Sequence, residues 1–217
     1  MELEGGGRAA GARLMSDRDR IARLKIELDD WQPAIWRRVE VPPTTTLKGL
    51  HDVVQAVMPL QDYHLFEFRA DDRRHAIPDP EWDFEKTWSA KTTRLATLVQ
   101  RGVSELVYTY DFGDDWRHTL TIESLDEVDP AVEYPRFIEG QHRAPPEDIG
   151  GLPGFELFLE AIADPDHEDH DHLVHWSGGT FDPKTLDVID IQKRIAKLAR
   201  RRTIGKAAFA KSRNRIT

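Results

Sequence analysis

The residues best suited to chemistry lie in one stretch, YTYDFGDDWRHTLTIE, at positions 108–123. Within it, Asp111 and Asp114 precede Trp116 and His118. A carboxylate beside an imidazole orients the ring and raises its basicity, as a general base or a metal ligand requires. The structural alternative is that the aspartates cap backbone amides of a turn, while the tryptophan fills the core and the histidine hydrogen-bonds a neighbour.

The same stretch predicts how these side chains are held. Apolar and polar residues alternate on both sides of its acidic centre, which is typical of a β-hairpin. Gly113-Asp114 is expected to form a two-residue turn, because glycine supplies the positive φ that such a turn needs. Asp111 would then face Trp116 and lie diagonally from His118 on one side of the hairpin. His64, on another predicted strand, could join them.

A second candidate site is the loop PPEDIGGLPGF at positions 145–155. Glu147 and Asp148 could bind a hard cation or a basic peptide. They could equally cap a turn and dock the loop on the sheet. Gly150-Gly151 permits backbone shapes that other residues avoid. Because no phosphate-loop Lys-Ser/Thr pattern follows a strand, a nucleotide cradle is not expected.

A third stretch, DPDHEDHDHLVHW at positions 164–176, interleaves four histidines with five acids. Such a composition could bind zinc or nickel. However, the spacing of the histidines (His167, His170, His172 and His175) matches no closed metal site, and a polar loop after a helix explains it as well. The chain also lacks a nucleophile elbow, an HExxH helix and a dinucleotide fingerprint. We therefore predict no metal and no cofactor.

The periodicity of the rest of the chain predicts the elements around these sites. Strands are expected at 21–28, 34–41, 63–69 and 73–77, an irregular segment at 78–89, and extended chain at 134–138. Helices are expected at 46–58 with Thr46 as N-cap, at 95–100, at 155–162 after Pro153-Gly154, and at 184–202 with Asp182 as cap. Strands and helices do not alternate in βαβ units, so the predicted class is α+β with a mostly antiparallel sheet.

Composition limits the classes of protein that fit. The 217 residues contain no cysteine, which excludes disulfides and thiolate metal sites. No apolar run approaches the roughly 20 residues of a membrane span, and the first residues lack a signal core, so a cytoplasmic protein is expected. Ten of the 30 basic residues follow position 190, where there is no acid, so the last 27 residues carry +10 within a net charge of −9. This basic tail, Lys193 to Arg215, could contact nucleic acid or be a solvated helix end.

Several motifs together resemble one family, the plasmid pRiA4b ORF-3-like proteins, also described as passenger TnpR-like proteins of an insertion element. The resemblance covers Ile21 to Ile195. It rests on IWRR at 35–38, Leu47 with Leu50-His51, HLFEF at 64–68, YTYDFGD at 108–114 with Trp116 and His118, PPED at 145–148 with Gly150-Gly151, and Trp176 with FDP at 181–183. It implies an α/β-roll: a curved, mostly antiparallel sheet packed against helices. Many relatives carry cysteines beside PPED, where this chain has Ala144 and Ile149, so no thiol-based role carries over.

These observations give one domain and two functional hypotheses. Residues 1–18 are expected to be disordered, 19–195 to form the α+β domain, and 196–217 to form the basic tail; residues 1–14 could precede an alternative start at Met15. The first hypothesis is a non-catalytic binding module associated with plasmids or mobile elements. Its recognition surface for a protein or nucleic acid would use His64, Asp111, Asp114, Trp116, His118, Glu147 and Asp148. The alternative is a metal-dependent hydrolase or nuclease that uses His64, Asp111 and His118.

Overall fold

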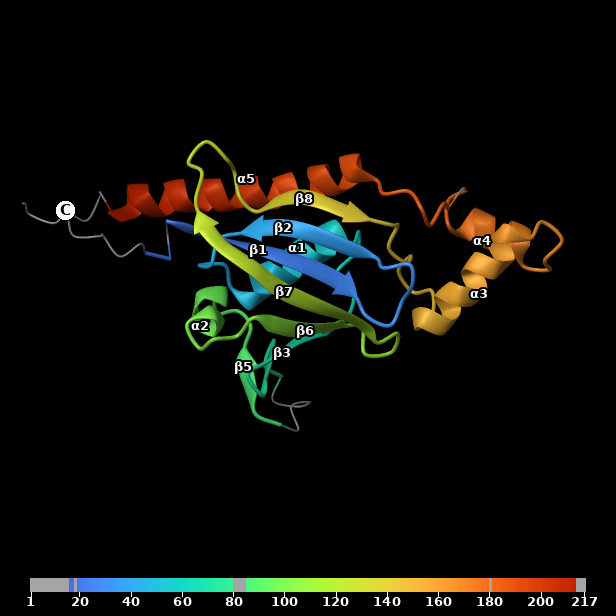
Figure 1. The fold of residues 1–217 in the computed structure, drawn as a ribbon, viewed down its shortest axis with the longest axis horizontal. Coiled ribbons are helices and arrows are strands. Elements are labelled where there is room, and N and C mark those ends of the chain that lie inside the picture. The colour runs from blue at the N-terminus through green and yellow to red at the C-terminus, as the bar shows by residue number, and fades with distance from the viewer. Residues whose placement is uncertain (1–15, 18, 80–84, 180, 214–217) are drawn as a thin grey trace, which may run out of the picture.

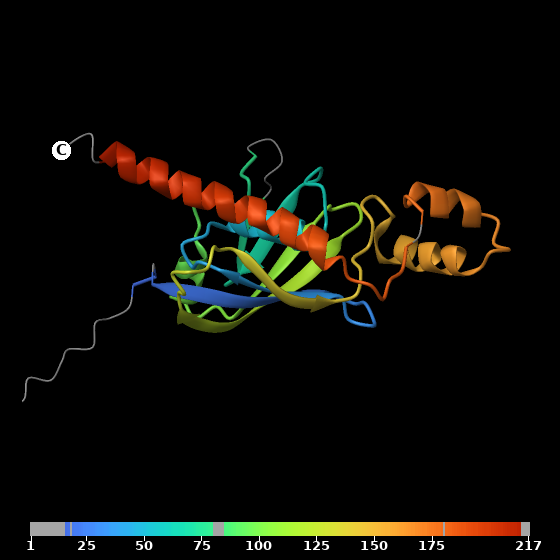
Figure 2. The same cartoon turned by 90° about the horizontal axis from the view of Figure 1, so that it is seen from above.

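The fold is built on one eight-stranded sheet with helices on one of its sides (Figures 1 and 2). The computed structural model describes residues 16–17, 19–79, 85–179 and 181–213. The order of the strands across the sheet is β5-β4-β3-β6-β7-β1-β2-β8. Their bounds are β1 Arg20–Leu28, β2 Trp36–Val41, β3 Phe66–Ala70, β4 Arg73–Ala76, β5 Thr87–Ser89, β6 Glu105–Tyr110, β7 Trp116–Glu127 and β8 Arg136–Gln141.

Strict alternation in the sequence explains the two faces of the sheet. In β1, Leu24, Ile26 and Leu28 are buried, whereas Lys25 and Glu27 between them remain partly exposed. Successive side chains of a strand point to opposite faces, so the apolar set of each strand enters one core. The other face carries ion pairs that join different strands: Arg23–Glu40 links the neighbours β1 and β2, and Arg38–Glu123 reaches from β2 across β1 to β7.

Two helices cover the apolar face. Helix α1 (Leu47–Val57) begins where the Thr46 hydroxyl accepts a hydrogen bond from the Gly49 amide at 3.1 Å, which confirms the predicted N-cap. Helix α5 (Val188–Arg213) packs beside α1 and β8, with Ile191 and Ile195 buried, and its C-terminal part extends beyond the sheet (Figure 2). The remaining helices are α2 (Leu95–Val99), α3 (Gly151–Ala163) and α4 (His170–Trp176); the last two lie together at one end of the sheet (Figure 1).

The predicted α+β class is confirmed, and every strand pair is antiparallel except β4 with β5. The segment 78–89 was expected to be irregular, but its last residues form β5. They do so because β4 offers a free edge that β5 extends in parallel. Residues 80–84 and most of the segment 1–18 lie outside the described residues.

The starts of two helices differ from the prediction, and one helix was not predicted. Helix α3 starts at Gly151, so Pro153 and Gly154 lie inside its first turn, where a proline needs no amide hydrogen bond. The segment expected to be a polar loop contains α4. Helix α5 starts four residues later than expected, because Asp182 caps a separate turn through the Lys184 amide and Asp187 accepts from the Asp190 amide instead.

Candidate functional site

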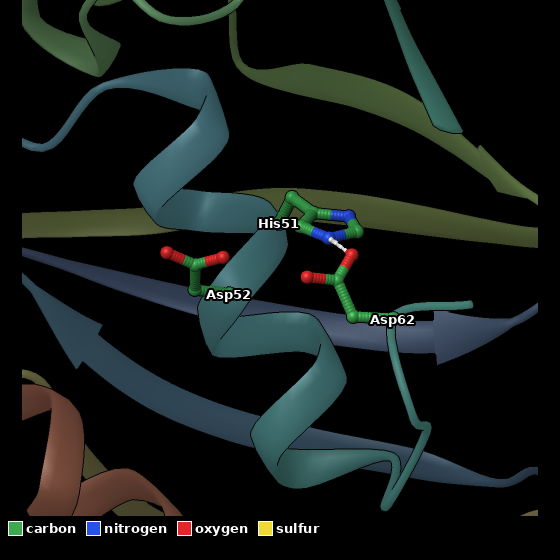
Figure 3. Close-up of side chains that lie close together, drawn as sticks. All are labelled: His51, Asp52 and Asp62. Atoms are coloured by element: carbon green, nitrogen blue, oxygen red, sulfur yellow. Dashed lines mark hydrogen bonds and ion pairs between the residues drawn. The ribbon is translucent and has the colours of Figure 1, made fainter. Parts of the chain in front are cut away.

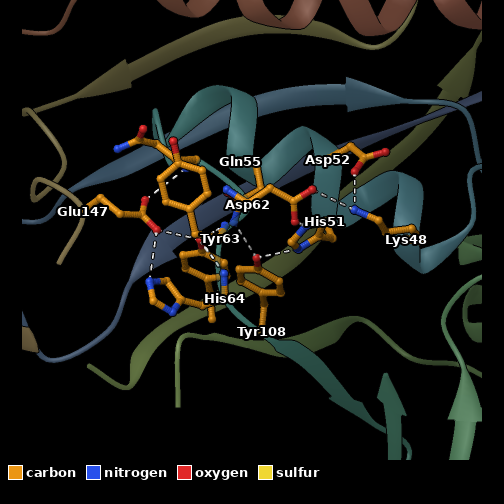
Figure 4. A network of polar contacts seen from close by, with 11 residues as sticks. Lys48, His51, Asp52, Gln55, Asp62, Tyr63, His64, Tyr108 and Glu147 are labelled. Carbon is orange, nitrogen blue, oxygen red and sulfur yellow. Dashed lines mark hydrogen bonds and ion pairs between the residues drawn. The ribbon is translucent and has the colours of Figure 1, made fainter. Parts of the chain in front are cut away.

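A buried histidine on α1 starts a chain of polar contacts that runs toward the end of the β6–β7 hairpin (Figure 4). His51 Nδ1 lies 2.8 Å from the Tyr108 hydroxyl on β6, and His51 Nε2 lies 2.7 Å from Asp62 Oδ1 in the segment after α1. The ring is fully buried and stacks on Phe66 with ring centroids 3.8 Å apart. Two neighbours therefore fix both ring nitrogens of His51.

The partners of His51 assign its tautomer. The Gln55 amide nitrogen donates to the Tyr108 oxygen at 3.1 Å, and the Gln55 carbonyl accepts from the Asp62 amide at 2.8 Å. Tyr108 is then left to donate to His51 Nδ1, and His51 Nε2–H donates to Asp62. Burial lowers the pKa of His51 to about 4, and the Lys48 charge acts in the same direction against the opposing effect of Asp62. The imidazole is therefore neutral at pH 7.

His51, Asp52 and Asp62 offer three possible metal ligands within 4.8 Å of one another (Figure 3). An internal cation already pairs with both carboxylates of this group, because Lys48 Nζ lies 2.8 Å from Asp52 Oδ1 and 3.3 Å from Asp62 Oδ2. A metal ion would have to displace both the ammonium and the proton on His51 Nε2. The geometry thus favours a structural network that joins α1 to β6.

The second part of the network docks the PPED loop. The Tyr110 hydroxyl donates to Glu147 Oε1 at 2.6 Å and accepts from the Tyr63 amide at 3.0 Å. Glu147 Oε2 accepts from the Gln61 amide at 3.0 Å, and the Glu147 side chain is only 6% exposed. Burial, reinforced by Glu147, raises the pKa of Tyr110, so the phenol remains a donor. Glu147 therefore holds the loop against residues 61–63, in agreement with the docking alternative.

His64 lies among three carboxylates at the open end of this network. Its Nε2 is 2.8 Å from Asp148 Oδ1, 3.5 Å from Asp111 Oδ2 and 3.8 Å from Glu147 Oε1. Burial alone lowers the pKa of His64, but the hydrogen bond to Asp148 and the three negative charges outweigh it and raise the pKa overall. Even with a protonated imidazole, the cluster retains excess negative charge.

Exposed apolar side chains flank this cluster. Tyr63 and Leu65, on either side of His64, are 70% and 69% exposed, and Phe112, next to Asp111, is 47% exposed. The Asp111 amide donates to the Leu65 carbonyl at 3.0 Å, so the two segments lie side by side. We call the set Tyr63, His64, Leu65, Asp111, Phe112, Glu147 and Asp148 the hairpin-end surface.

Comparison with known proteins agrees with these motifs. Residues 20–190 match the sequence profile described as plasmid pRiA4b ORF-3-like protein. The chain belongs to the plasmid pRiA4b ORF-3-like family. It is 38% identical over 193 residues to the uncharacterized protein y4hQ of Sinorhizobium fredii, a match that spans 84% of this chain and 98% of the relative.

The fold of this ORF-3-like protein also occurs in a solved structure. The crystal structure of MM3350, a protein of unknown function from Methanosarcina mazei Go1, is 35% identical and superposes with a TM-score of 0.73. The match covers 79% of this chain and 96% of the other. None of the helices in the described part of the chain combines the length and apolar character that crossing a bilayer requires.

The hairpin turn of this ORF-3-like protein differs from the prediction. Tyr110, and not Asp111, pairs with Trp116, so the loop comprises residues 111–115. Positive φ falls on Asp111 (55°) and Asp115 (54°) rather than on Gly113. Asp111 tolerates this conformation because its own carboxylate accepts from the Gly113 amide at 2.9 Å. The longer turn brings Asp111 to His64.

The other predicted site residues have different surroundings. Trp116 and His118 are both 3% exposed, and His118 pairs with Tyr108 inside the core. Burial lowers the pKa of His118 to about 4. The structure thus brings together His64, Asp111, Glu147 and Asp148, whereas His118 stays in the core. Asp114 contacts the PPED loop, because its Oδ2 accepts from the Gly150 amide at 3.1 Å.

The histidine-rich stretch forms the surface helix α4 and the turn before it. His170 Nδ1 lies 3.0 Å from the Ala161 carbonyl on α3, and His172 and His175 are exposed. In the described ranges, both clusters with metal-ligand spacing lie elsewhere. The histidine-rich composition of this stretch is therefore not enough to form a metal site.

The inner part of the network was not predicted from the sequence: His51, Gln55, Asp62 and Tyr110. A usable signal existed at His51, which occupies the apolar stripe of α1 one turn before Val54 and Gln55. A polar side chain on a buried stripe needs a partner, so His51 and Gln55 together indicate a buried network. The partner Asp62 gave no such signal, because it lies in irregular chain after the helix.

Proposed function

We propose that this protein is a binding module that recognises a segment of a partner protein at the hairpin-end surface. One observation carries the proposal: two largely buried carboxylates, fixed by hydrogen bonds, lie beside three exposed apolar side chains. Asp111 and Glu147 are only 14% and 6% exposed in their side chains, so their charges are preorganised and weakly hydrated. Preorganised groups lose little entropy on binding, which favours recognition.

The chemistry of the surface defines the partner. Excess negative charge around His64 attracts a lysine or arginine, and Tyr63, Leu65 and Phe112 offer contact area for an apolar side chain. The same carboxylates repel the phosphates of nucleic acid. A basic and apolar peptide segment therefore fits this surface better than DNA or RNA does.

The absence of catalysis in this proposal rests on the state of the histidines. His51 is buried and donates to Asp62 while it accepts from Tyr108, so both its nitrogens are committed to the fold. His64 is held as an ion-pair partner of Asp148 and Asp111. Histidines that are committed to hydrogen bonds and ion pairs in this way suit a scaffold for recognition.

A displayed library of random peptides tests the proposal. Peptides selected on the wild-type protein should combine a basic residue with an aromatic or aliphatic one. Leu65→Ser should weaken their binding at least about tenfold, as truncation of an interface anchor typically does. Leu157→Ser on α3 is the matched control, since Leu157 is 64% exposed against 69% for Leu65. Selected peptides that bind both variants equally well would contradict the proposal.

A second candidate is the metal-dependent hydrolase or nuclease. The observation that favours it is that His64, Asp111 and Asp148 offer ligand atoms that all lie within 4.8 Å of one another. One imidazole and two carboxylates suit Mn²⁺ or Zn²⁺. Titration calorimetry with each ion would support it if binding were lost in Asp111→Asn, with peptide binding tested separately in metal-free buffer. Absence of saturable binding by Mg²⁺, Mn²⁺ and Zn²⁺ would eliminate this candidate.

A further inference from the structure

The second half of α5 carries basic and apolar side chains together on its solvent side. Ile191, Ile195 and Ala199 are buried, and four exposed side chains lie on the opposite side of the helix at spacings of three and four residues: Lys197, Arg200, Arg201 and Ile204. We call these four residues the α5 stripe. Among the described residues, none of its three bases has an ion-pair partner, whereas Arg194 pairs with Asp190. The charge of the stripe is therefore available to a partner.

The α5 stripe has the chemistry that the hairpin-end surface is proposed to recognise. That surface holds three carboxylates around His64 and three exposed apolar side chains. Arg200 and Arg201 lie about one helical turn before Ile204, which is 69% exposed, so two cations and an apolar side chain are close together. Opposite charges across an interface guide the partners together and fix their register. The two surfaces are thus complementary in charge, and each has an apolar part.

Helix α5 leads away from the hairpin-end surface of its own molecule. Arg194 Nη1 donates to the Leu60 carbonyl at 3.2 Å, next to the residues that hold the PPED loop. Arg202 Nη2 donates to the Thr44 hydroxyl at 2.9 Å, at the other end of α1. The helix therefore runs along α1 toward the far side of the sheet (Figures 1 and 2). At 1.5 Å per residue, Ile204 lies about 15 Å beyond Arg194 along the helix axis, so only another molecule can bring an α5 stripe to this surface.

We propose that the α5 stripe of a second copy of this chain binds the hairpin-end surface, so that the protein associates with itself. This inference rests on the proposed function, because it names the partner of the same surface. Two copies that each donate α5 to the other form a closed pair with two-fold symmetry, in which the contact is used twice. Because one helix stripe and one hairpin end form a small contact, the association is weak and sensitive to salt.

Sedimentation equilibrium of the full chain tests self-association. In about 50 mM salt the average mass should rise with protein concentration between roughly 10 µM and 1 mM, and about 500 mM salt should reduce this rise, because salt shortens the range of charge interactions. The double variant Arg200→Glu and Arg201→Glu should weaken association at least about tenfold. The matched control, Lys91→Glu with Arg94→Glu, reverses two exposed bases near α2 and changes the net charge equally, so it should associate like the wild type.

A second pair of variants tests the apolar part of the contact. Ile204→Ser should also weaken association. Ile189→Ser is the matched control, since Ile189 is 66% exposed in the first turn of the same helix and lies outside the α5 stripe. Circular dichroism of both variants shows whether α5 is retained.

A mixture of two deficient variants tests which surfaces meet. Leu65→Ser alters the hairpin-end surface and leaves the α5 stripe intact, whereas the arginine double variant does the opposite. Each variant alone should associate at least about tenfold more weakly than the wild type. An equimolar mixture should associate more strongly than either variant, because the intact stripe of one meets the intact surface of the other. Variants that fail only because they are misfolded would not complement each other in this way.

Failure of this inference can be distinguished from failure of the proposed function. If random peptides bind the hairpin-end surface while the full chain remains monomeric up to about 1 mM, the partner is a different protein and self-association is refuted. No selected peptides together with a monomeric chain would contradict both proposals. Unchanged association in the arginine double variant, or no gain in the mixture, would also overturn the inference. So would a monomeric chain whose binding to a DNA duplex of about 20 base pairs is lost in that variant, since the stripe would then contact nucleic acid.

Discussion

Replacement of His51 by glutamine should remove part of the acid sensitivity of this protein. His51 is a fully buried imidazole that donates to Asp62 and accepts from Tyr108, so it is held neutral in the folded state. In the unfolded chain the same imidazole is solvated and takes up a proton near its ordinary pKa of 6.5. Glutamine can also donate and accept a hydrogen bond, but it does not titrate.

The size of the effect follows from linkage. Burial lowers the pKa of His51 to about 4. Between pH 6.5 and pH 4 the unfolded state therefore binds a proton that the folded state does not, and stability falls as the pH falls. From pH 7 to pH 5 this single group should lower the free energy of unfolding by about 2 kcal/mol. His118, with a pKa also lowered to about 4, should contribute a similar amount.

Urea denaturation at pH 7 and pH 5 measures this loss. Between the two pH values, the free energy of unfolding of His51→Gln should fall by about 2 kcal/mol less than that of the wild type, whatever the stability of the variant at pH 7. His172→Gln on α4 is the matched control, because it makes the same substitution at an exposed histidine. If His51→Gln showed the same pH dependence as the wild type, the neutral, buried state of His51 and the hydrogen-bond assignment built on it would be refuted.

Three further predictions concern the loops and the tail. Gly151→Ala should destabilise the protein clearly more than Gly178→Ala, for which a loss of about 1 kcal/mol is expected. A Cβ at Gly151 would lie 2.6 Å from the Asp114 carbonyl oxygen in the hairpin turn, whereas a Cβ at Gly178 would meet open space. Thermal denaturation of the two variants measures the difference. His64 has a raised pKa, so its contribution to loop docking is complete below pH 6.5 and is lost as the pH rises through the raised value. The backbone amides of residues 147–150 should therefore be less protected from hydrogen exchange at pH 8 than at pH 6, and His64→Gln should remove this difference. If the basic tail contacts DNA, the double change Arg200→Gln and Arg201→Gln should reduce the salt slope of binding by about 2.

Much of the fold could be predicted because its signals are local. The alternation in β1 and the helical period after Thr46 each require only a window of about ten residues, and tertiary structure did not override them. The family motifs also indicated the overall α+β fold class. The exceptions have physical causes: β5 exists because a distant edge strand accepts it, and α4 forms from a polar stretch because it packs against α3 (Figure 1).

The candidate site was predicted in its outer part and missed in its inner part. His64, Asp111, Glu147 and Asp148 are chemically conspicuous, and the structure places them together. The predicted two-residue turn was wrong because aspartates took the positive φ that glycine usually provides, and one such residue uses its own carboxylate to stabilise the turn. That change in register separates Asp111 from His118, which no local pattern could have shown.

The PPED segment connects the cavity beside Arg37 with the hairpin-end surface. Pro145 and Pro146 line the cavity beside Arg37, and Glu147 and Asp148 belong to the hairpin-end surface. The Cα atoms of Pro145 and Asp148 can be no more than about 11 Å apart, since consecutive Cα atoms are separated by about 3.8 Å. Two stiff prolines transmit a displacement instead of absorbing it. A substitution that displaces Pro145 or Pro146 would therefore displace the carboxylates of Glu147 and Asp148 as well.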